Sequence, residues 1–226
     1  MIPVTCIIPV RNGQDTIRRA VESAIVAGCD TVLIYDDAST DNTQSILEDL
    51  CQQYSDVEFY ATLSLVKSGV NYARNFLCEM ADNGLIIPLD ADDCLNDITP
   101  LREAYEPDTW VYGDHIERCG DGIEYRKGAA AGALVRKNIT GISFMFHRRD
   151  WLKVGGYDYD FAYAEDYALQ CALTAGGIRP KYVETPVYDR YMKPDGNERS
   201  ALAGTFWAFY HQLARMKYQN LFAGTG

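Results

Sequence analysis

Short apolar runs alternate with stretches of helical periodicity through the first hundred residues, and this order restricts the possible folds more than any single motif does. Each run has the length and apolar content of a buried strand, whereas the stretches between runs repeat apolar residues every three or four positions. Such alternation is typical of a parallel sheet with helices on both faces. The predicted strands are Val4–Val10, Thr31–Tyr35, Val57–Tyr60 and Leu85–Leu89, and the predicted helices are residues 14–27, a stretch from a cap at Ser39 or Asp41 through Leu50, and residues 70–81.

Polar residues directly follow three of these predicted strands. They are Arg11-Asn12, Asp36-Asp37 and the cluster from Asp90 to Asp93. The carboxyl ends of parallel strands meet at one edge of the sheet, and the ligands of such folds bind beyond this edge. The three polar clusters are therefore the first candidates for a binding site.

The last of these clusters places three carboxylates in four positions, at Asp90, Asp92 and Asp93. Like charges this close raise one another's pKa, so a fold that keeps them ionised usually supplies a cation. Oxygen ligands favour a hard divalent ion, Mg2+ or Mn2+, and such ions commonly bring a phosphate with them. Taken alone, the cluster is better explained by a polar loop or helix cap that closes the strand.

Composition restricts the class of protein. The 226 residues can form one domain with a full core, and the net charge of −11 disfavours an extended nucleic-acid surface. Seven scattered cysteines without a C-x-x-C pair argue against a disulfide framework and a zinc site.

No apolar run reaches the roughly 20 residues of a membrane span and the start lacks signal-peptide features, so we expect a cytoplasmic protein. One middle segment is basic, and it is either a binding patch or a solvated rim: Arg126, Lys127, Arg136, Lys137, Arg148 and Arg149.

The second half of the chain has a less regular pattern, which predicts a small antiparallel element. A helix expected over residues 164–175 opens with Glu165-Asp166, two acids at a positive helix terminus. A polar loop is expected over residues 186–200. The other predicted elements are strands at Thr109–Tyr112, Ile123–Arg126 and Ile142–Phe146, a short helix at Arg149–Val154 and a last helix at Ala201–Leu221.

Six short motifs occur between about Val4 and Ser200. They are Ile7-Ile8-Pro9-Val10-Arg11-Asn12, Ile34-Tyr35-Asp36-Asp37-Ala38-Ser39-Thr40-Asp41, Gly69 to Asn75 with Ala73-Arg74-Asn75, Leu89-Asp90-Ala91-Asp92-Asp93, Val154-Gly155-Gly156-Tyr157-Asp158 and Glu165-Asp166. In order and approximate spacing they resemble the motifs of family 2 glycosyltransferases, inverting enzymes of the GT-A fold that use nucleotide-sugar donors. Each motif alone is weak, and the set of six carries the resemblance.

The resemblance implies an α/β GT-A fold with a Rossmann-like, mostly parallel sheet and helices on both faces. A single domain over residues 1–226 is expected, with the small antiparallel element in its second half. Residues 1–105 would form the nucleotide-sugar-binding half and residues 106–200 the acceptor and catalytic half. Residues 201–226 would form the C-terminal helix.

The resemblance also implies roles for single residues on the donor side. Asp37 would hydrogen-bond the base, typically uracil, and Pro9 and Arg11 would line the same nucleotide pocket. Asp92 would ligate a Mn2+ or Mg2+ ion that bridges the two donor phosphates. The other positions assigned to the donor are Arg74, Asp90 as a ribose or metal contact, Ala91, Arg190 and Lys193.

A carboxylate is also needed on the acceptor side, because a hydroxyl has too high a pKa to attack unaided. The resemblance gives this role to Asp166, with Glu165 as its orienting neighbour. Without the resemblance, the pair is better explained as a helix cap whose negative charges interact favourably with the positive end of the helix dipole. Arg74, for its part, is also explained by an ion pair with Asp37 or Asp90.

The chain departs from the family pattern in two places. Met192 stands where many relatives have a histidine, and a thioether is a poor ligand for Mg2+ or Mn2+. Arg190 or Lys193 would then bind phosphate directly. The segment Gln212-Leu213-Ala214-Arg215-Met216 lacks the tryptophan of the processive-synthase signature, so we interpret it as a helix face and expect transfer of a single sugar. Residues 188–200 have the composition of a lid or of an ordinary surface loop.

These observations predict an inverting, metal-dependent glycosyltransferase that moves one sugar from a nucleotide diphosphate donor, preferably UDP-linked, to a hydroxyl acceptor. One alternative is a sugar-phosphate nucleotidyltransferase, although the chain lacks the Gly-rich, lysine-containing opening of those enzymes. Another is an inactive module that binds a nucleotide. The donor sugar and oligomeric state stay open, as does the acceptor among saccharide, lipid, protein and modified nucleic-acid base.

Overall fold

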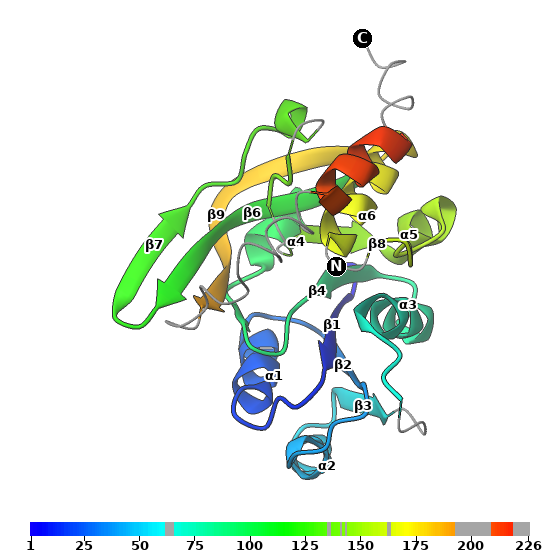
Figure 1. Cartoon of the computed structure of the whole chain (residues 1–226). Coiled ribbons are helices and arrows are strands. Elements are labelled where there is room, and N and C mark those ends of the chain that lie inside the picture. Colours follow the sequence, from blue (N-terminus) through cyan, green and yellow to red (C-terminus); the bar gives the residue numbers. More distant parts are fainter. Residues whose placement is uncertain are drawn as a thin grey trace.

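The structure is a computed structural model and describes residues 1–61, 66–134, 137–140, 142, 144–161, 164–192 and 209–218. Its first half is the predicted alternation of strands and helices (Figure 1). The strands are β1 (Val4–Val10), β2 (Thr31–Asp36), β3 (Val57–Ala61) and β4 (Leu85–Pro88), and the helices between them are α1 (Ile17–Val26), α2 (Thr43–Gln53) and α3 (Val70–Met80). β1 pairs in parallel with β2 and with β4, and β3 pairs in parallel with β2.

Helices cover both faces of this parallel half. Successive β1 side chains point to opposite faces, so that Cys6 and Ile8 pack in the core below α1 and α2. Ile7, between them, packs in the core that α3 covers. Burial of both faces explains why these strands are continuous apolar runs in the sequence.

Antiparallel pairing begins where β8 (Phe144–His147) joins β4. The order across the nine-stranded sheet is β3-β2-β1-β4-β8-β6-β9-β5, and β7 pairs with β6 to form the hairpin at the left of Figure 1. β8 and β7 pair with β6 in antiparallel fashion, as β5 does with β9, whereas β9 and β6 are parallel. The remaining elements are β5 (Cys94–Leu95), α4 (Thr99–Ala104), β6 (Thr109–Cys119), β7 (Gly122–Arg126), η1 (Ala131–Ala133), α5 (Arg148–Val154), α6 (Glu165–Ala175) and β9 (Arg179–Met192).

Several boundaries differ from the prediction. Residues 186–192 were expected in a polar loop, but they continue β9, because they pair with β6 up to Cys119. The rest of the expected loop, with the part of the expected lid beyond Met192, lies outside the described residues. Helix α4 was not predicted at all. Of the expected last helix, residues 209–218 are described and are helical.

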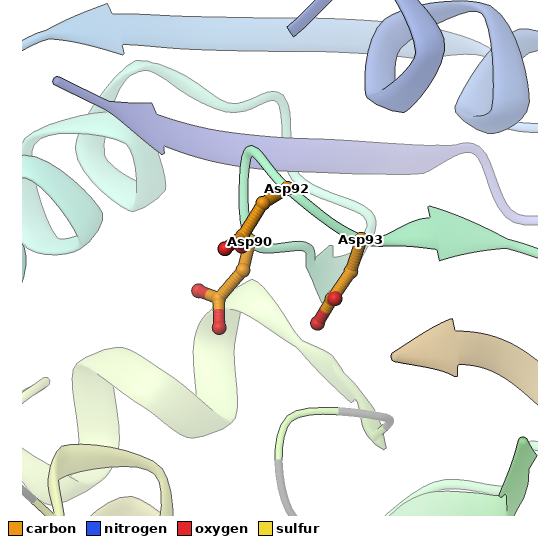
Figure 2. Close-up of side chains that lie close together, drawn as sticks. All are labelled: Asp90, Asp92 and Asp93. Carbon is orange, nitrogen blue, oxygen red and sulfur yellow. The ribbon is translucent and has the colours of Figure 1, made fainter. Parts of the chain in front are cut away.

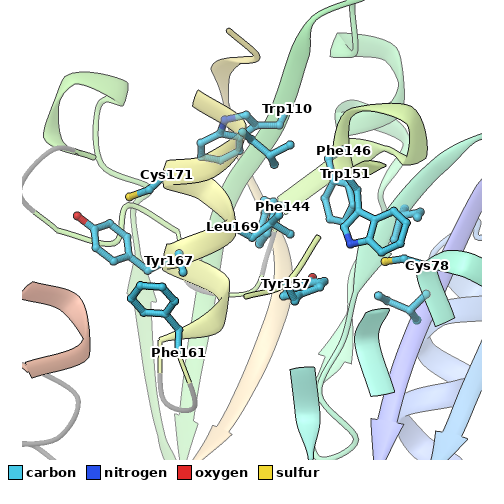
Figure 3. Close-up of a cluster of buried hydrophobic side chains, with 14 of the residues drawn as sticks. Cys78, Trp110, Phe144, Phe146, Trp151, Tyr157, Phe161, Tyr167, Leu169 and Cys171 are labelled. Atoms are coloured by element: carbon cyan, nitrogen blue, oxygen red, sulfur yellow. The ribbon is translucent and has the colours of Figure 1, made fainter. Parts of the chain in front are cut away.

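Aromatic side chains fill the second core, between α6, β6, β8 and α5 (Figure 3). The Trp110 ring lies 5.6 Å from that of Phe144 and 5.1 Å from that of Tyr112, measured between centroids. Trp151 and Tyr157 are buried in the same cluster. These aromatic residues therefore belong to the hydrophobic core. In the described part of the chain, no helix has the length and apolar content needed to cross a membrane.

A buried carboxylate fixes the irregular middle of β6. The register between β6 and β9 shifts on both sides of Asp114, whose side chain is fully buried. Its carboxylate accepts hydrogen bonds from the Tyr182 hydroxyl at 2.6 Å, from the Gly128 N–H at 2.7 Å and from the Tyr125 hydroxyl. Burial alone would raise the pKa of Asp114, but these donors outweigh it and lower the pKa. The segment after β7 is thereby held against β6.

We predict that Asp114→Asn lowers the free energy of unfolding by roughly 2 kcal/mol at pH 7, because hydrogen bonds to a charged group are lost. The pKa of Asp114 is lowered in the folded state, so its stabilisation is present above the unfolded pKa of about 3.9 and is lost as pH falls through the folded value. Urea unfolding at pH 7 and at pH 3.5 should therefore show a smaller difference between variant and wild type in acid. Asp121→Asn, in the exposed turn before β7, is the control and should change stability by less than about 0.5 kcal/mol. A difference that is the same at both pH values would contradict this account.

Candidate active site

The loops after β1 and β2 are interlocked by side chains. The Asn12 N–H donates to Ser39 Oγ at 2.8 Å, and the Thr40 N–H donates to Asn12 Oδ1 at 2.8 Å. The Gly13 N–H donates to Thr43 Oγ1 at 2.9 Å. Asn12 adopts a positive φ of 53°, which asparagine tolerates better than most residues. Two of the three polar clusters predicted at this edge of the sheet thus form one unit.

Asp37 connects this unit to α3. Its buried carboxylate accepts hydrogen bonds from the N–H groups of Ser68 at 2.5 Å and Gly69 at 2.9 Å, just before the helix begins. Each carboxylate oxygen has a second lone pair, so these bonds leave acceptor capacity. Of the other two residues predicted for the nucleotide pocket, Pro9 lies near the end of β1 and Arg11 is exposed directly after it.

Arg74 of α3 is buried between two carboxylates. Its side chain is 2% exposed, with Nη2 at 2.8 Å from Asp90 Oδ1 and Nη1 at 2.5 Å from Glu165 Oε1. Burial alone would lower the pKa of Arg74, but Glu165 and Asp90 outweigh it and raise the pKa. The predicted pair with Asp90 is present, whereas the alternative partner Asp37 is bonded elsewhere. Arg74 thus ties the loop after β4 to the start of α6.

Asn75, the next residue of α3, holds the turn that leads to α6. Asn75 Oδ1 accepts the Tyr157 N–H at 2.7 Å, and Asn75 Nδ2 donates to the Tyr157 carbonyl at 2.8 Å. Gly156 has a φ of 80°, and a Cβ there would lie 2.7 Å from Asn75 Oδ1. This close approach explains the glycine of the Gly155-Gly156 motif. The Arg74-Asn75 motif of α3 and the Gly155-Gly156 motif, which are far apart in sequence, are therefore in direct contact.

The three aspartates after β4 converge as predicted (Figure 2). One carboxylate oxygen from each of Asp90, Asp92 and Asp93 lies within 4.8 Å of the others. Asp93 is buried, and burial together with Asp90 raises its pKa to about 8, although the Tyr191 N–H donates to it at 2.8 Å. Three carboxylate oxygens this close fit a hard divalent cation, although only Asp93 is buried and Asp92 is exposed. Sequence reasoning left Asp93 out of the metal ligands, and its carboxylate lies within the same cluster.

Arg19 of α1 supports this acidic loop, and sequence reasoning missed it. Its Nη2 donates to the Asp92 carbonyl at 2.6 Å, and its guanidinium lies 3.8 Å over the Tyr191 ring. The Tyr191 N–H in turn donates to Asp93. An arginine on the polar side of an amphipathic helix carries no sequence signal for such a role. Ala91, in the same loop, packs against the core.

Asp166 and Asp90 line the same cavity of about 360 Å³. Asp166 Oδ2 accepts a hydrogen bond from Asn138 Nδ2 at 2.8 Å. The N-cap residue Ala164 makes no side-chain cap bond, but Asp166 Oδ1 accepts the Tyr167 N–H at 2.7 Å within the first turn of α6, as the helix-cap explanation of this pair expects. Glu165 faces Arg74, and burial raises its pKa although Arg74 opposes this. Asn138 was not predicted, since nothing in its local sequence marks it.

Arg190, at the end of β9, lines the same cavity and lies 3.5 Å from Glu117 Oε1. Lys193, predicted beside it, falls outside the described residues. The basic segment of the sequence does not form one patch. Arg148 of α5 donates instead to the carbonyls of Cys78 and Glu79 at 2.8 and 2.9 Å, away from this cavity.

A family model described as glycosyl transferase family 2 matches residues 5–180 of the chain. The chain belongs to this family. An uncharacterized glycosyltransferase of Mycoplasma pneumoniae, the MG025 homolog, is 37% identical over 97 residues, which cover 39% of this chain and 31% of that protein. All six motifs that carried the resemblance fall within the matched residues.

Solved structures of two other proteins share the fold. The S. aureus protein TarS, in complex with UDP, superposes with a TM-score of 0.68 at 17% identity, over 88% of this chain and 63% of TarS. GalNAc-T7 with UDP, GalNAc and Mn2+ superposes with a TM-score of 0.70 at 15% identity, over 94% of this chain and 48% of that one. These similarities confirm the predicted α/β GT-A fold. The chain spans less than two thirds of the length of these proteins.

We predict that Arg74→Gln costs about 3–5 kcal/mol of stability at pH 8, because Glu165 is left buried without its cation. The loss should be smaller at pH 5, where Glu165 can take up a proton. Urea unfolding at both pH values measures this. Arg18→Gln removes exposed ion pairs with Glu22 at 3.7 Å and Asp49 at 3.8 Å, and this control should cost less than about 1 kcal/mol. Equal effects of the two substitutions would show that the buried ion pairs do not set the stability of this site.

Proposed function

We propose that this chain is an inverting, metal-dependent glycosyltransferase that moves one sugar from a UDP-linked donor to a hydroxyl acceptor. The observation that carries the proposal is the position of Asp90 and Asp166 on one cavity, tied together through Arg74 and Glu165. A single displacement at an anomeric carbon requires a cation site and a base that face one cavity.

Asp90, Asp92 and Asp93 would hold the divalent ion. Such an ion acts as a Lewis acid that stabilises the negative charge developing on the departing diphosphate. Asp37, Pro9 and the loop after β1 would bind the base. The UDP complexes of TarS and GalNAc-T7, the latter with Mn2+, support a UDP donor and this metal.

Asp166 would serve as the general base. As the acceptor oxygen forms its bond to the anomeric carbon and the bond to the diphosphate breaks, Asp166 takes the hydroxyl proton. Asn138 Nδ2 donates to Asp166 Oδ2 at 2.8 Å and the Tyr167 N–H donates to Asp166 Oδ1 at 2.7 Å, and the two bonds fix the orientation of the carboxylate. Attack from the face opposite the leaving group inverts the configuration at that carbon.

Arg190 would bind the donor diphosphate in place of the family histidine. It lies on the cavity, and its pKa is raised, since the surrounding carboxylates and Tyr188 outweigh the burial that lowers it. A guanidinium that stays charged suits phosphate oxygens. Its ion pair with Glu117, at 3.5 Å, is long enough to yield to a closer anion.

We predict that Asp92→Asn weakens Mn2+ binding at least about tenfold, because one of three oxygen ligands loses its charge. Calorimetry with Mn2+ measures the affinity, and hydrolysis of UDP-sugars with and without EDTA measures the dependence of turnover on the metal. Asp121→Asn, an exposed aspartate of the β6–β7 turn, is the matched control and should bind Mn2+ as the wild type does. Turnover that survives EDTA, or an Asp92→Asn variant with unchanged turnover, would remove the metal from the proposal.

We predict that Asp166→Asn keeps UDP binding within about twofold of the wild type and lowers turnover by roughly 10²–10⁴-fold, because the base is lost. Calorimetry with UDP and Mn2+ gives the first quantity. Mass spectrometry of products from a panel of UDP- and GDP-sugars gives the second and identifies the donor sugar. Asn138→Ala should lower turnover less, since the base stays and only its orientation is lost. Near-normal turnover of Asp166→Asn would exclude it as the base, and nucleotide binding without turnover of any donor by the wild type would indicate an inactive module.

A further inference from the structure

Three cations of the basic segment line the cavity beside Asp166: Arg126, Lys127 and Lys137. Arg126 ends β7 and Lys127 follows it, while Lys137 approaches from the stretch after η1. This sets them apart from Arg148, whose guanidinium is bonded to backbone carbonyls at the end of α3. The fold therefore gathers one part of the basic segment at the candidate site.

Most charges on the cavity are already accounted for. Arg190 is assigned to the donor diphosphate above, and Arg126 pairs with Glu117 and Glu124 at 2.9 Å each. Asp90 is matched by Arg74, which is buried behind it at 2.8 Å. Two lysines, Lys127 and Lys137, then remain on the cavity beside the carboxylate of Asp166. In a chain with a net charge of −11, two lysines at this position point to an anionic ligand.

Two of these cations are available to a ligand. Lys137 is exposed, and among the described residues no carboxylate lies within ion-pair distance of it. Lys127 pairs with Glu184, but both side chains are about two thirds exposed, at 65% and 66%. Ion pairs this exposed contribute little and exchange readily for a phosphate or carboxylate that several cations share.

The position of Lys137 places this charge on the acceptor side. It directly precedes Asn138, whose amide holds Asp166 at 2.8 Å. The acceptor hydroxyl must lie at Asp166 if that residue is the base, whereas the donor diphosphate belongs at the aspartate cluster. Resting on the proposed function, we infer that the acceptor is an anionic molecule, whose phosphate or carboxylate group binds between Lys127 and Lys137 while its hydroxyl faces Asp166.

Calorimetry on the protein saturated with UDP and Mn2+ tests this inference. The probes are glucose 6-phosphate and glucuronate, each compared with neutral glucose. We expect the charged sugars to bind at least about tenfold more tightly than glucose, and this preference to fall as salt is raised. The double variant Lys127→Gln/Lys137→Gln should lose the preference while glucose binding stays unchanged. Lys153→Gln, an exposed lysine of α5, is the matched control and should keep the preference.

Charged sugars that bind no more tightly than glucose would overturn the inference, as would a preference that survives in the double variant. UDP-glucuronate and UDP-glucose are compared in a second titration, with Mn2+ alone present. A preference for UDP-glucuronate, without one among the free sugars, would place the charge on the donor and also overturn it. A folded wild-type protein that binds no UDP would contradict the proposed function instead.

Thermal melts of each variant establish that a lost preference for the charged sugars is not a loss of folding. The single variant Lys137→Gln should reduce the preference for the charged sugars at least twofold.

Discussion

The site depends on a single buried guanidinium. Removing the charge of Arg74 from water is costly, and the cost is offset only because Asp90 and Glu165 both lie within ion-pair distance. The planar guanidinium meets the two carboxylates with different nitrogens, which fixes their directions as well as their charges. Three elements remote in sequence, α3, the loop after β4 and α6, are therefore set relative to one another before any ligand binds.

The two halves of the sheet contribute different parts of the site. The parallel strands bring the loops after β1, β2 and β4 to one edge, as the switch-point rule for such sheets requires. The antiparallel half adds the wall of the cavity through β6 and β9, and the last residues of β9 return to the acidic loop. There the Tyr191 N–H donates to Asp93, and the Tyr191 ring lies under Arg19. The end of β9 is thus part of the candidate metal site rather than of a separate loop.

How far the sequence predicted this arrangement depends on burial. β1, β2 and β4 are buried on both faces, so their apolar runs were found and their ends located the aspartates. β6 was predicted too short and β9 was not predicted as a strand, because their outer parts carry Glu117, Arg118 and Arg190 and so resemble a loop. Pro186 also favoured a loop, because proline has no backbone N–H to donate within a strand. Arg19 and Asn138 act through contacts between elements, which no local pattern contains.

Glu165 and Asp93 differ in which group compensates their negative charge, and this difference bears on the proposed metal site. Glu165 faces the fixed cation of Arg74 at 2.5 Å. Asp93 has no such ion pair among the described residues, and burial together with the neighbouring Asp90 raises its pKa to about 8. Glu165 is thus compensated by an internal arginine, whereas Asp93 accepts a backbone N–H. The divalent ion of the proposed function would therefore lie on the side of Asp90 away from Arg74, toward Asp93.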